Sequence, residues 1–323
     1  MNSALLDWTV IRRKFHKGAL LLGNGASCAI AKKFSYQSLF EKAQGKLGST
    51  LAPKDLKLFQ EFGTNNFETV LSSLRITIRV LGVLGRETAT LKGRHKSIRS
   101  ALIKSVGRVH PSAPDGSLKG SLATVCSELR KYRRVYTTNY DLLVYWAMAE
   151  DFKSFTDWFR HSDFSVDDAT DLEGRTTVVF LHGALHLFVD ENGTAHKHKW
   201  NSLRGLLVQF HQSWRSSGMP LFVSEGSSEE KLAFIGRFDY LSEARRALLK
   251  EDRTLVVFGH SMSVQDRHIA KGIRASKITR VAVALRPGSD QPSKRAHYRS
   301  LLSGKRVCFF DATTHPIGKL NPV

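Results

Sequence analysis

Seven short apolar segments, each bounded by glycine or polar residues, predict buried β-strands. They cover residues 19–22, 135–138, 177–181, 221–223, 255–258, 281–285 and 307–310. Stretches with helical apolar spacing follow several of them, at residues 28–34, 142–148, 264–273 and 294–302. Strands that alternate with helices are typical of parallel strands joined by crossover helices. The pattern predicts an α/β fold with a doubly wound, mostly parallel, Rossmann-like sheet.

Between residues 46 and 133 the apolar spacing fits helices better than short strands. We expect a helical insertion of about these bounds within a single α/β domain that spans residues 1–323. The serine, glycine, proline and aspartate content of residues 111–120 predicts a loop. The sequence DENG at residues 190–193 predicts a turn between two short strands.

The chain of 323 residues is strongly basic, with 49 lysines and arginines against 29 aspartates and glutamates and a net charge of +20. Part of the excess lies in residues 86–108, where the single carboxylate is Glu87. The cations there are Arg86, Lys92, Arg94, Lys96, Arg99, Lys104 and Arg108. This stretch is either a surface for nucleic acid or an acidic protein, or a solvated helix face.

The three cysteines, Cys28, Cys126 and Cys308, are far apart and odd in number, which indicates neither a disulfide framework nor a structural zinc site. Charged residues interrupt the apolar positions near the start, which argues against a signal peptide there. No stretch reaches the roughly 20 apolar residues that span a bilayer. We expect a cytoplasmic protein with no membrane partner and no bound metal.

The first candidate site is the sequence GNGAS at residues 23–27, after the predicted strand 19–22. Glycines let the backbone approach a pyrophosphate closely, and hydroxyl and backbone N–H groups at a helix start donate to anions. Its candidate ligand contacts are Gly23, Asn24, Gly25 and Ser27. The alternative is a tight strand-to-helix turn with Ser27 as the N-cap.

The second candidate site is the sequence TTNYD at residues 137–141, at the carboxyl end of the next predicted strand. Open α/β sheets bind ligands at this edge. Thr138 is a candidate binding residue, Asn139 could orient a ribose hydroxyl or a water, and Asp141 could oppose positive charge on a sugar ring. The alternative is that Asn139 and Asp141 cap the following helix.

The third candidate site is the sequence LHG at residues 181–183, where His182 is a candidate general base and Gly183 permits close approach of a ligand. A structural histidine is the alternative for His182. His186 could join it in a metal site if the segment were helical, but Gly183 and the preceding strand argue against a helix.

The fourth candidate site is the sequence GHS at residues 259–261, after the predicted strand 255–258. Gly259 and Ser261 form a second glycine-and-hydroxyl turn, which fits the other half of a dinucleotide. An ordinary strand-to-helix connection is the alternative. Asp266 and His268 follow at the head of a predicted helix.

The order GNGAS, TTNYD, LHG and GHS, each after a predicted strand, resembles the GAGxS, TQNxD, HG and GTS series of the sirtuins. The chain is most similar to the zinc-free, sirtuin-like branch of bacterial anti-phage defence, whose members hydrolyse NAD. It has no four-cysteine zinc module, and CAIAKKFSYQSLF stands where sirtuins have GIPDFR. Arg286-Pro287 follows the strand where sirtuins often have an asparagine for the adenosine.

The resemblance implies a role for each motif. Gly23, Gly25 and Ser27 would hold the pyrophosphate, with Gly259 and Ser261 near the adenosine. Asn139 and Asp141 would contact the nicotinamide ribose and amide, and His182 would act on the ribose hydroxyls or a water. Glu225 and Lys231 receive no assigned role.

These observations predict an NAD⁺ glycohydrolase that releases nicotinamide and ADP-ribose and depletes NAD in anti-phage defence. Because such an activity harms its host, we expect restraint by homo-oligomerisation or a closed site until an activating protein or nucleic acid arrives. Two alternatives stay open. One is a non-catalytic module that senses NAD or ADP-ribose, and the other is a basic nucleic-acid-binding protein with a vestigial pocket.

Overall fold

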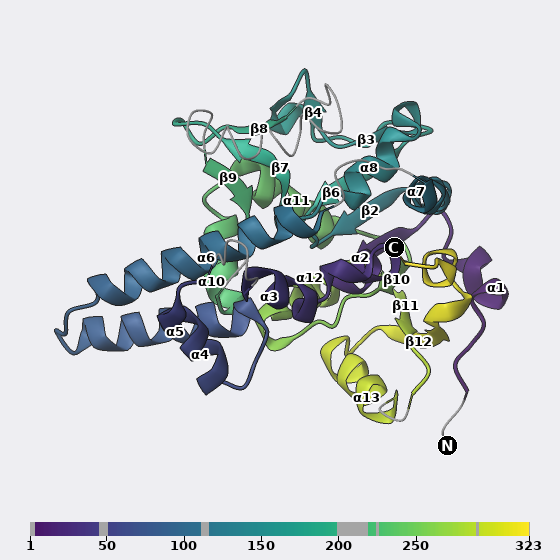
Figure 1. Cartoon of the computed structure of the whole chain (residues 1–323). Helices are drawn as coiled ribbons and strands as arrows, with labels where there is room; N and C mark the ends of the chain where they lie inside the picture. Colours follow the sequence, from purple (N-terminus) through teal and green to yellow (C-terminus); the bar gives the residue numbers. More distant parts are fainter. Residues whose placement is uncertain are drawn as a thin grey trace.

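The computed structural model of the chain describes residues 4–44, 51–110, 116–198, 219–223, 226–288 and 291–322. Its centre is a seven-stranded parallel sheet with the order β12-β11-β10-β1-β2-β6-β3 (Figure 1). The strands are β1 (Ala19–Leu22), β2 (Arg134–Thr137), β3 (Phe155–Thr156), β6 (Thr176–Phe180), β10 (Leu255–Phe258), β11 (Arg280–Leu285) and β12 (Arg306–Asp311). The predicted α/β fold is confirmed.

The strand order reverses between β1 and β10, because β2 and β6 extend the sheet on one side of β1 and β10, β11 and β12 extend it on the other. The residues of β1 are at most 1% exposed, as expected for a strand covered on both faces. Crossovers in opposite directions place helices on opposite faces of such a sheet. In open α/β sheets, ligands bind at the carboxyl edge where the order reverses.

Helices flank the sheet (Figure 1). Outside residues 46–133 they are α1 (Trp8–Ile11), α2 (Asn24–Ile30), α3 (Tyr36–Gln44), α8 (Leu143–Ala149), α10 (Ser228–Ile235), α11 (Asp239–Lys250), α12 (Arg267–Ala275) and α13 (Gln291–Leu301). Short 3₁₀ turns are η1 (Arg12–Lys14), η2 (Lys32–Phe34), η3 (Phe152–Ser154), η4 (Val166–Asp168), η5 (Val264–Asp266), η6 (Ala312–Thr314) and η7 (Pro316–Lys319). Within the described ranges, no helix is both long enough and apolar enough to cross a bilayer.

A second, antiparallel sheet has the order β4-β5-β8-β7-β9. Its strands are β4 (Phe159–Arg160), β5 (Asp163–Phe164), β7 (Gly183–Val189), β8 (Ala195–Lys197) and β9 (Met219–Phe222). The predicted turn at residues 190–193 joins β7 to β8 and is confirmed. The predicted strand 221–223 corresponds to β9, which pairs with β7 rather than with the parallel sheet.

The predicted helical stretch contains α4 (Pro53–Glu61), α5 (Phe67–Val83), α6 (Ala89–Val109) and α7 (Gly116–Leu129). Helices α5 and α6 pack against each other and project from the body as a long hairpin (Figure 1). The loop predicted for residues 111–120 is wrong for residues 116–120, which begin α7, and residues 111–115 lie outside the described residues. Leu118, Leu122 and Val125 are buried at helical spacing, so core packing outweighs the loop-like composition.

Candidate functional site

The turns after β1 and β10 touch each other at the point where the strand order reverses. The Gly25 N–H donates to the Gly259 carbonyl at 2.8 Å. A Cβ on Gly25 would lie 2.7 Å from the Gly259 Cα, and one on Gly23 would lie 2.5 Å from the His260 Cα. Gly259 also has a φ of +69°, which disfavours other residues. Glycine is therefore required at these positions to let two ligand-facing turns meet.

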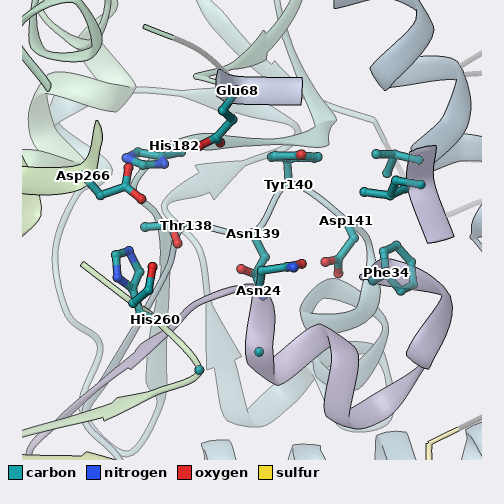
Figure 2. Close-up of a pocket in the computed structure, with 15 residues that line it drawn as sticks. Asn24, Phe34, Glu68, Thr138, Asn139, Tyr140, Asp141, His182, His260 and Asp266 are labelled. Carbon is teal, nitrogen blue, oxygen red and sulfur yellow. The ribbon is translucent and has the colours of Figure 1, made fainter. Parts of the chain in front are cut away.

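A cavity of about 250 Å³ opens above these turns, at the carboxyl ends of the central strands (Figure 2). We call it the switch-point cavity. Its lining residues are Asn24, Gly25, Phe34, Leu39, Glu68, Val106, Thr138, Asn139, Tyr140, Asp141, His182, Gly259, His260, Ser261 and Asp266. All four sequence motifs contribute to it. Glu68 and Val106 come from α5 and α6, so the helical insertion forms part of its wall.

Three predicted binding residues do not line this cavity. Ser27 is 1% exposed and lies within α2, whose N-cap is Gly23, so the N-cap alternative for Ser27 is wrong. Gly23 packs closely against the backbone of His260, which is one of the lining residues. Gly183 has a φ of +72°, and a Cβ there would lie 2.0 Å from the Leu221 carbonyl oxygen. The pairing of β7 with β9 is therefore what requires glycine at position 183.

Asn139 and Asp141 both bind protein groups around Ser27. The Asn139 Nδ2 donates to the Gly23 carbonyl at 3.0 Å and to the Ser27 Oγ at 2.8 Å. The Ser27 hydroxyl donates to Asp141 Oδ2 at 2.5 Å, and the Leu143 N–H donates to Oδ1 at 2.9 Å. Asp141 thus accepts the first N–H of α8, whose N-cap is Leu142, and Asn139 binds the turn after β1 instead of capping that helix. This network joins the turns after β1 and β2.

Sequence reasoning gave no role to a buried ion pair on the other side of the cavity. Lys231, from α10, is 1% exposed, and its Nζ donates to Asp266 Oδ1 at 2.8 Å. The same Nζ lies 3.8 Å from Glu68 Oε2. Burial alone would raise the pKa of Asp266, but the Lys231 ammonium and nearby imidazoles hold that pKa well below its ordinary value. Asp266 therefore stays ionised at neutral pH and gives the cavity a negatively charged carboxylate.

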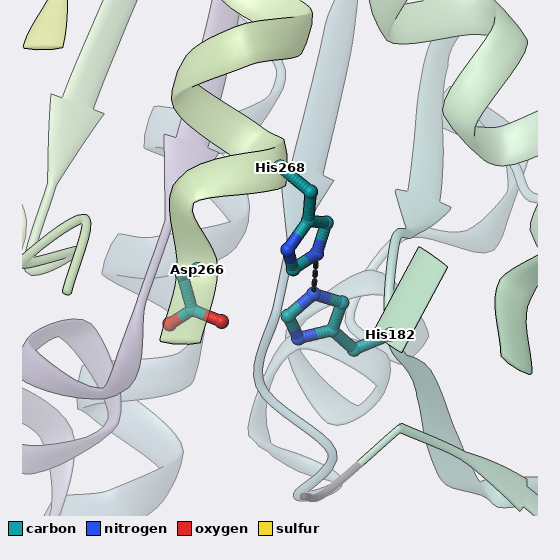
Figure 3. A group of neighbouring side chains, drawn as sticks. All are labelled: His182, Asp266 and His268. Atoms are coloured by element: carbon teal, nitrogen blue, oxygen red, sulfur yellow. Dashed lines mark hydrogen bonds between the residues drawn. The ribbon is translucent and has the colours of Figure 1, made fainter. Parts of the chain in front are cut away.

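Three histidines surround this carboxylate. His182 Nε2 and His268 Nε2 lie 2.8 Å apart, with Asp266 beside them (Figure 3). Burial, and then the charge of Lys231, holds the pKa of His182 well below its ordinary value, and burial lowers the pKa of His268 to about 4. Both rings are therefore neutral near pH 7, and the Nε2–H of one ring donates a hydrogen bond to the Nε2 of the other. A neutral His182 can accept a proton, but its lowered pKa makes it a weaker base than an ordinary histidine.

His260 presents a donor to the cavity. Its Nδ1 accepts the Met262 N–H at 3.0 Å, so the proton of the neutral ring is on Nε2. That Nε2 is buried and has no hydrogen-bond partner among the described residues. Buried polar groups are rarely left without partners except at sites that receive a ligand or water.

The donor atoms of His182, Asp266 and His268 lie within 4.8 Å of one another, which is close enough to hold a metal ion. The Lys231 ammonium already binds one carboxylate oxygen of this group, Asp266 Oδ1, which is then not free to coordinate a metal ion. His186 does not join the group: it lies in β7 and stacks on Tyr145 with ring centroids 4.2 Å apart. The expected absence of a bound metal stays a prediction.

A second cavity, of about 270 Å³, adjoins the first across Gly25 and Gly259. Its lining residues are Gly25, Cys28, Ala29, Phe258, Gly259, Ala284, Arg286, Ala312, Thr313 and Gly318. Arg286 supplies a cation on its wall. The two cavities thus share Gly25 and Gly259 in their linings, and we refer to the pair of cavities as the groove.

The fold and this groove define a doubly wound α/β protein with a candidate ligand site at its switch point. The chain belongs to the family described as "Domain of unknown function (DUF4917)", which matches residues 20–317. No curated protein matches the chain.

Proposed function

We propose that the protein is a cytoplasmic NAD⁺ glycohydrolase that transfers the ADP-ribosyl group to water. The observation that carries the proposal is the groove of two cavities that share Gly25 and Gly259, with an ionised carboxylate and a neutral histidine in one cavity and Arg286 in the other. Together the cavities fall within the roughly 300–1,000 Å³ that ligand pockets occupy.

The positions of the charged residues favour one direction for a bound dinucleotide. The adenylate half would lie beside Arg286, whose guanidinium suits a phosphate. The pyrophosphate would cross Gly25 and Gly259, where the absence of side chains leaves the backbone accessible. The nicotinamide riboside half would then enter the switch-point cavity, among Asn139, His182 and Asp266.

The chemistry asks for an anion and a base. When the bond between ribose C1′ and the nicotinamide nitrogen breaks, the bonding electron pair returns to the ring, which leaves as neutral nicotinamide. Positive charge develops on the sugar, and a nearby carboxylate stabilises it. A water oxygen then bonds to C1′ and gives up one proton. The products are nicotinamide, ADP-ribose and a proton.

Each side chain of the cavity has a role in this scheme. Asp266 would face the cationic sugar, because Asp141 already binds Ser27 and the Leu143 N–H. His182 would accept the proton of the water, and the Nε2–H of His260 would donate to a ribose or carboxamide oxygen. Asn139 would hold the turns that shape the cavity.

The resemblance to sirtuin-like defence proteins supports the same activity, and NAD depletion in anti-phage defence stays a prediction from it. The expected restraint by homo-oligomerisation, an activating protein or nucleic acid also stays a prediction. The NAD-sensing alternative shares the groove and differs only in the absence of bond cleavage.

The test is to incubate the protein with NAD⁺ and separate nicotinamide and ADP-ribose by chromatography. We expect Asp266→Asn and His182→Ala each to lower turnover by about 100-fold or more, because each removes a group that acts in the transition state. Asp252→Asn is the matched control, since that side chain is 60% exposed and remote from the groove, and it should keep full turnover.

Binding of NAD⁺ is measured in the same preparations by calorimetry. If the wild type binds NAD⁺ but releases no nicotinamide, even after nucleic acid is added, the protein is an NAD-sensing module and not a hydrolase. Absence of both binding and release would overturn the proposal.

A further inference from the structure

A third cavity lies between the hairpin of α5 and α6 and the helix α10. Its volume is about 440 Å³. We call it the hairpin cavity. Its lining residues are Arg75, Ile78 and Arg79 of α5, Lys92 and His95 of α6, and Glu230, Ala233, Phe234 and Arg237 of α10 and the turn after it.

Among the described residues that line it, the hairpin cavity has three arginines and a lysine against one carboxylate. Glu230 Oε1 lies 3.9 Å from both Arg75 Nε and Arg79 Nη1, beyond hydrogen-bond distance. Its Oε2 accepts the Ser227 N–H at 2.9 Å, so this carboxylate also caps α10. In the described part of the chain, Lys92 and Arg237 make no ion pair. One partly shared carboxylate therefore leaves most of the positive charge uncompensated.

The arrangement of these cations indicates the kind of ligand. They come from α5, α6 and the turn after α10 and line one hollow, whereas a nucleic-acid backbone is usually met by a strip of cations along a surface. A chain of linked phosphates offers several anionic groups to cations on these three segments. Ile78 and Phe234 add an apolar wall, against which an aromatic base can pack.

We propose that the hairpin cavity binds a small ligand with two or more linked phosphate groups, such as a nucleoside polyphosphate. The inference goes beyond the NAD⁺ glycohydrolase and does not depend on it. It gives the basic helical insertion a small-molecule partner in place of the two readings that the sequence left open. Glu230 lines the hairpin cavity, and the next residue, Lys231, binds Asp266 of the switch-point cavity. The two cavities are therefore linked through adjacent residues of α10.

The test is isothermal titration of the NAD-free protein with inorganic tripolyphosphate and, separately, with ATP. The variant Arg79→Glu/Arg237→Glu reverses two charges of the cavity. The matched control is Lys277→Glu/Arg280→Glu, which makes the same change in net charge at exposed positions near the amino-terminal end of β11. The control is essential because a net charge of +20 attracts any polyanion weakly.

We expect saturable binding with one site per chain, weakened at least about tenfold in the cavity variant and less than about twofold in the control. Tighter binding of ATP than of tripolyphosphate would show that the nucleoside contributes, and equal binding would show that the phosphates suffice. Equal weakening in both variants, or no saturable binding to the wild type, would overturn the proposal. Neither result bears on NAD cleavage, so the two proposals fail separately.

Discussion

Glu230 and Lys231 are neighbours on α10, yet Glu230 lines the hairpin cavity, whereas Lys231 binds a residue that lines the switch-point cavity. Lys231 is 1% exposed and binds Asp266 at 2.8 Å in the switch-point cavity. Glu230 has a side chain that is 20% exposed and lies 3.9 Å from its arginine partners in the hairpin cavity. One helix thus carries a tight buried ion pair and a loose solvated one, side by side.

The contrast separates two uses of charge. A buried charge without its partner is costly, so the switch-point cavity holds its ions in fixed geometry before any ligand arrives. Solvated charges interact weakly with each other, so those of the hairpin cavity can rearrange around an incoming anion. The first setting suits catalysis and the second suits binding.

The largest expected effect is on the buried pair. Lys231→Met leaves two carboxylates, Asp266 and Glu68, close together in a buried site, and should lower the free energy of unfolding by about 3–5 kcal/mol. Urea denaturation followed by circular dichroism measures the change. The double variant Lys231→Met/Asp266→Asn should recover part of the loss, because it removes one unpaired charge. A double variant no more stable than the single one would contradict this account.

Glu128, a buried carboxylate outside both cavities, allows the contribution of a buried charge to stability to be measured through its dependence on pH. Burial would raise the pKa of Glu128, but His315 and Lys131 outweigh it and lower that pKa to about 2. The Tyr132 hydroxyl also donates to this carboxylate, and the charge of Glu128 acts on the pKa of His16 in the upward direction. Since the folded-state pKa is the lower one, the carboxylate stabilises the fold above its ordinary pKa near 4.5, and the effect is lost as the pH falls toward 2.

This stabilisation amounts to roughly 3 kcal/mol at neutral pH, because each pKa unit corresponds to about 1.4 kcal/mol. The difference in free energy of unfolding between the wild type and Glu128→Gln should therefore shrink between pH 6 and pH 3. Urea titrations at both pH values measure it. A difference that stays constant with pH would show that Glu128 acts through packing rather than charge.

The smallest expected effect is at Glu230. Glu230→Gln should change the free energy of unfolding by less than about 1 kcal/mol, because its ion pairs are loose and a glutamine oxygen can still accept the Ser227 N–H. The same variant should bind tripolyphosphate more tightly, since it removes the one carboxylate among the described residues of the cavity lining. A loss of stability as large as that of Lys231→Met would erase the contrast between the two cavities.

Local patterns in the sequence predicted much of this molecule. The strands at residues 19–22 and 255–258 have the predicted bounds. A short apolar run between glycine and polar residues is stable mainly as a strand of a sheet that is covered on both faces. The motifs after these strands meet in one cavity, because the carboxyl ends of neighbouring parallel strands share one edge.

The antiparallel sheet was not foreseen as a sheet, since β4 and β5 have two residues each and carry no alternation to recognise. Residues 116–120 look like a loop by composition, but buried leucines make them helical. Glu225, which the sequence left without a role, lies outside the described residues.

The sequence by itself determined the α/β fold, the glycine turns after β1 and β10, and most of the residues that line the switch-point cavity. These features depend on local apolar patterns and on the common edge of a parallel sheet. Only the tertiary structure decided that Asp141 binds Ser27 and the first N–H of α8 and that Asp266 pairs with Lys231. A carboxylate can serve either purpose, and the choice depends on which buried partner the fold brings within hydrogen-bond distance.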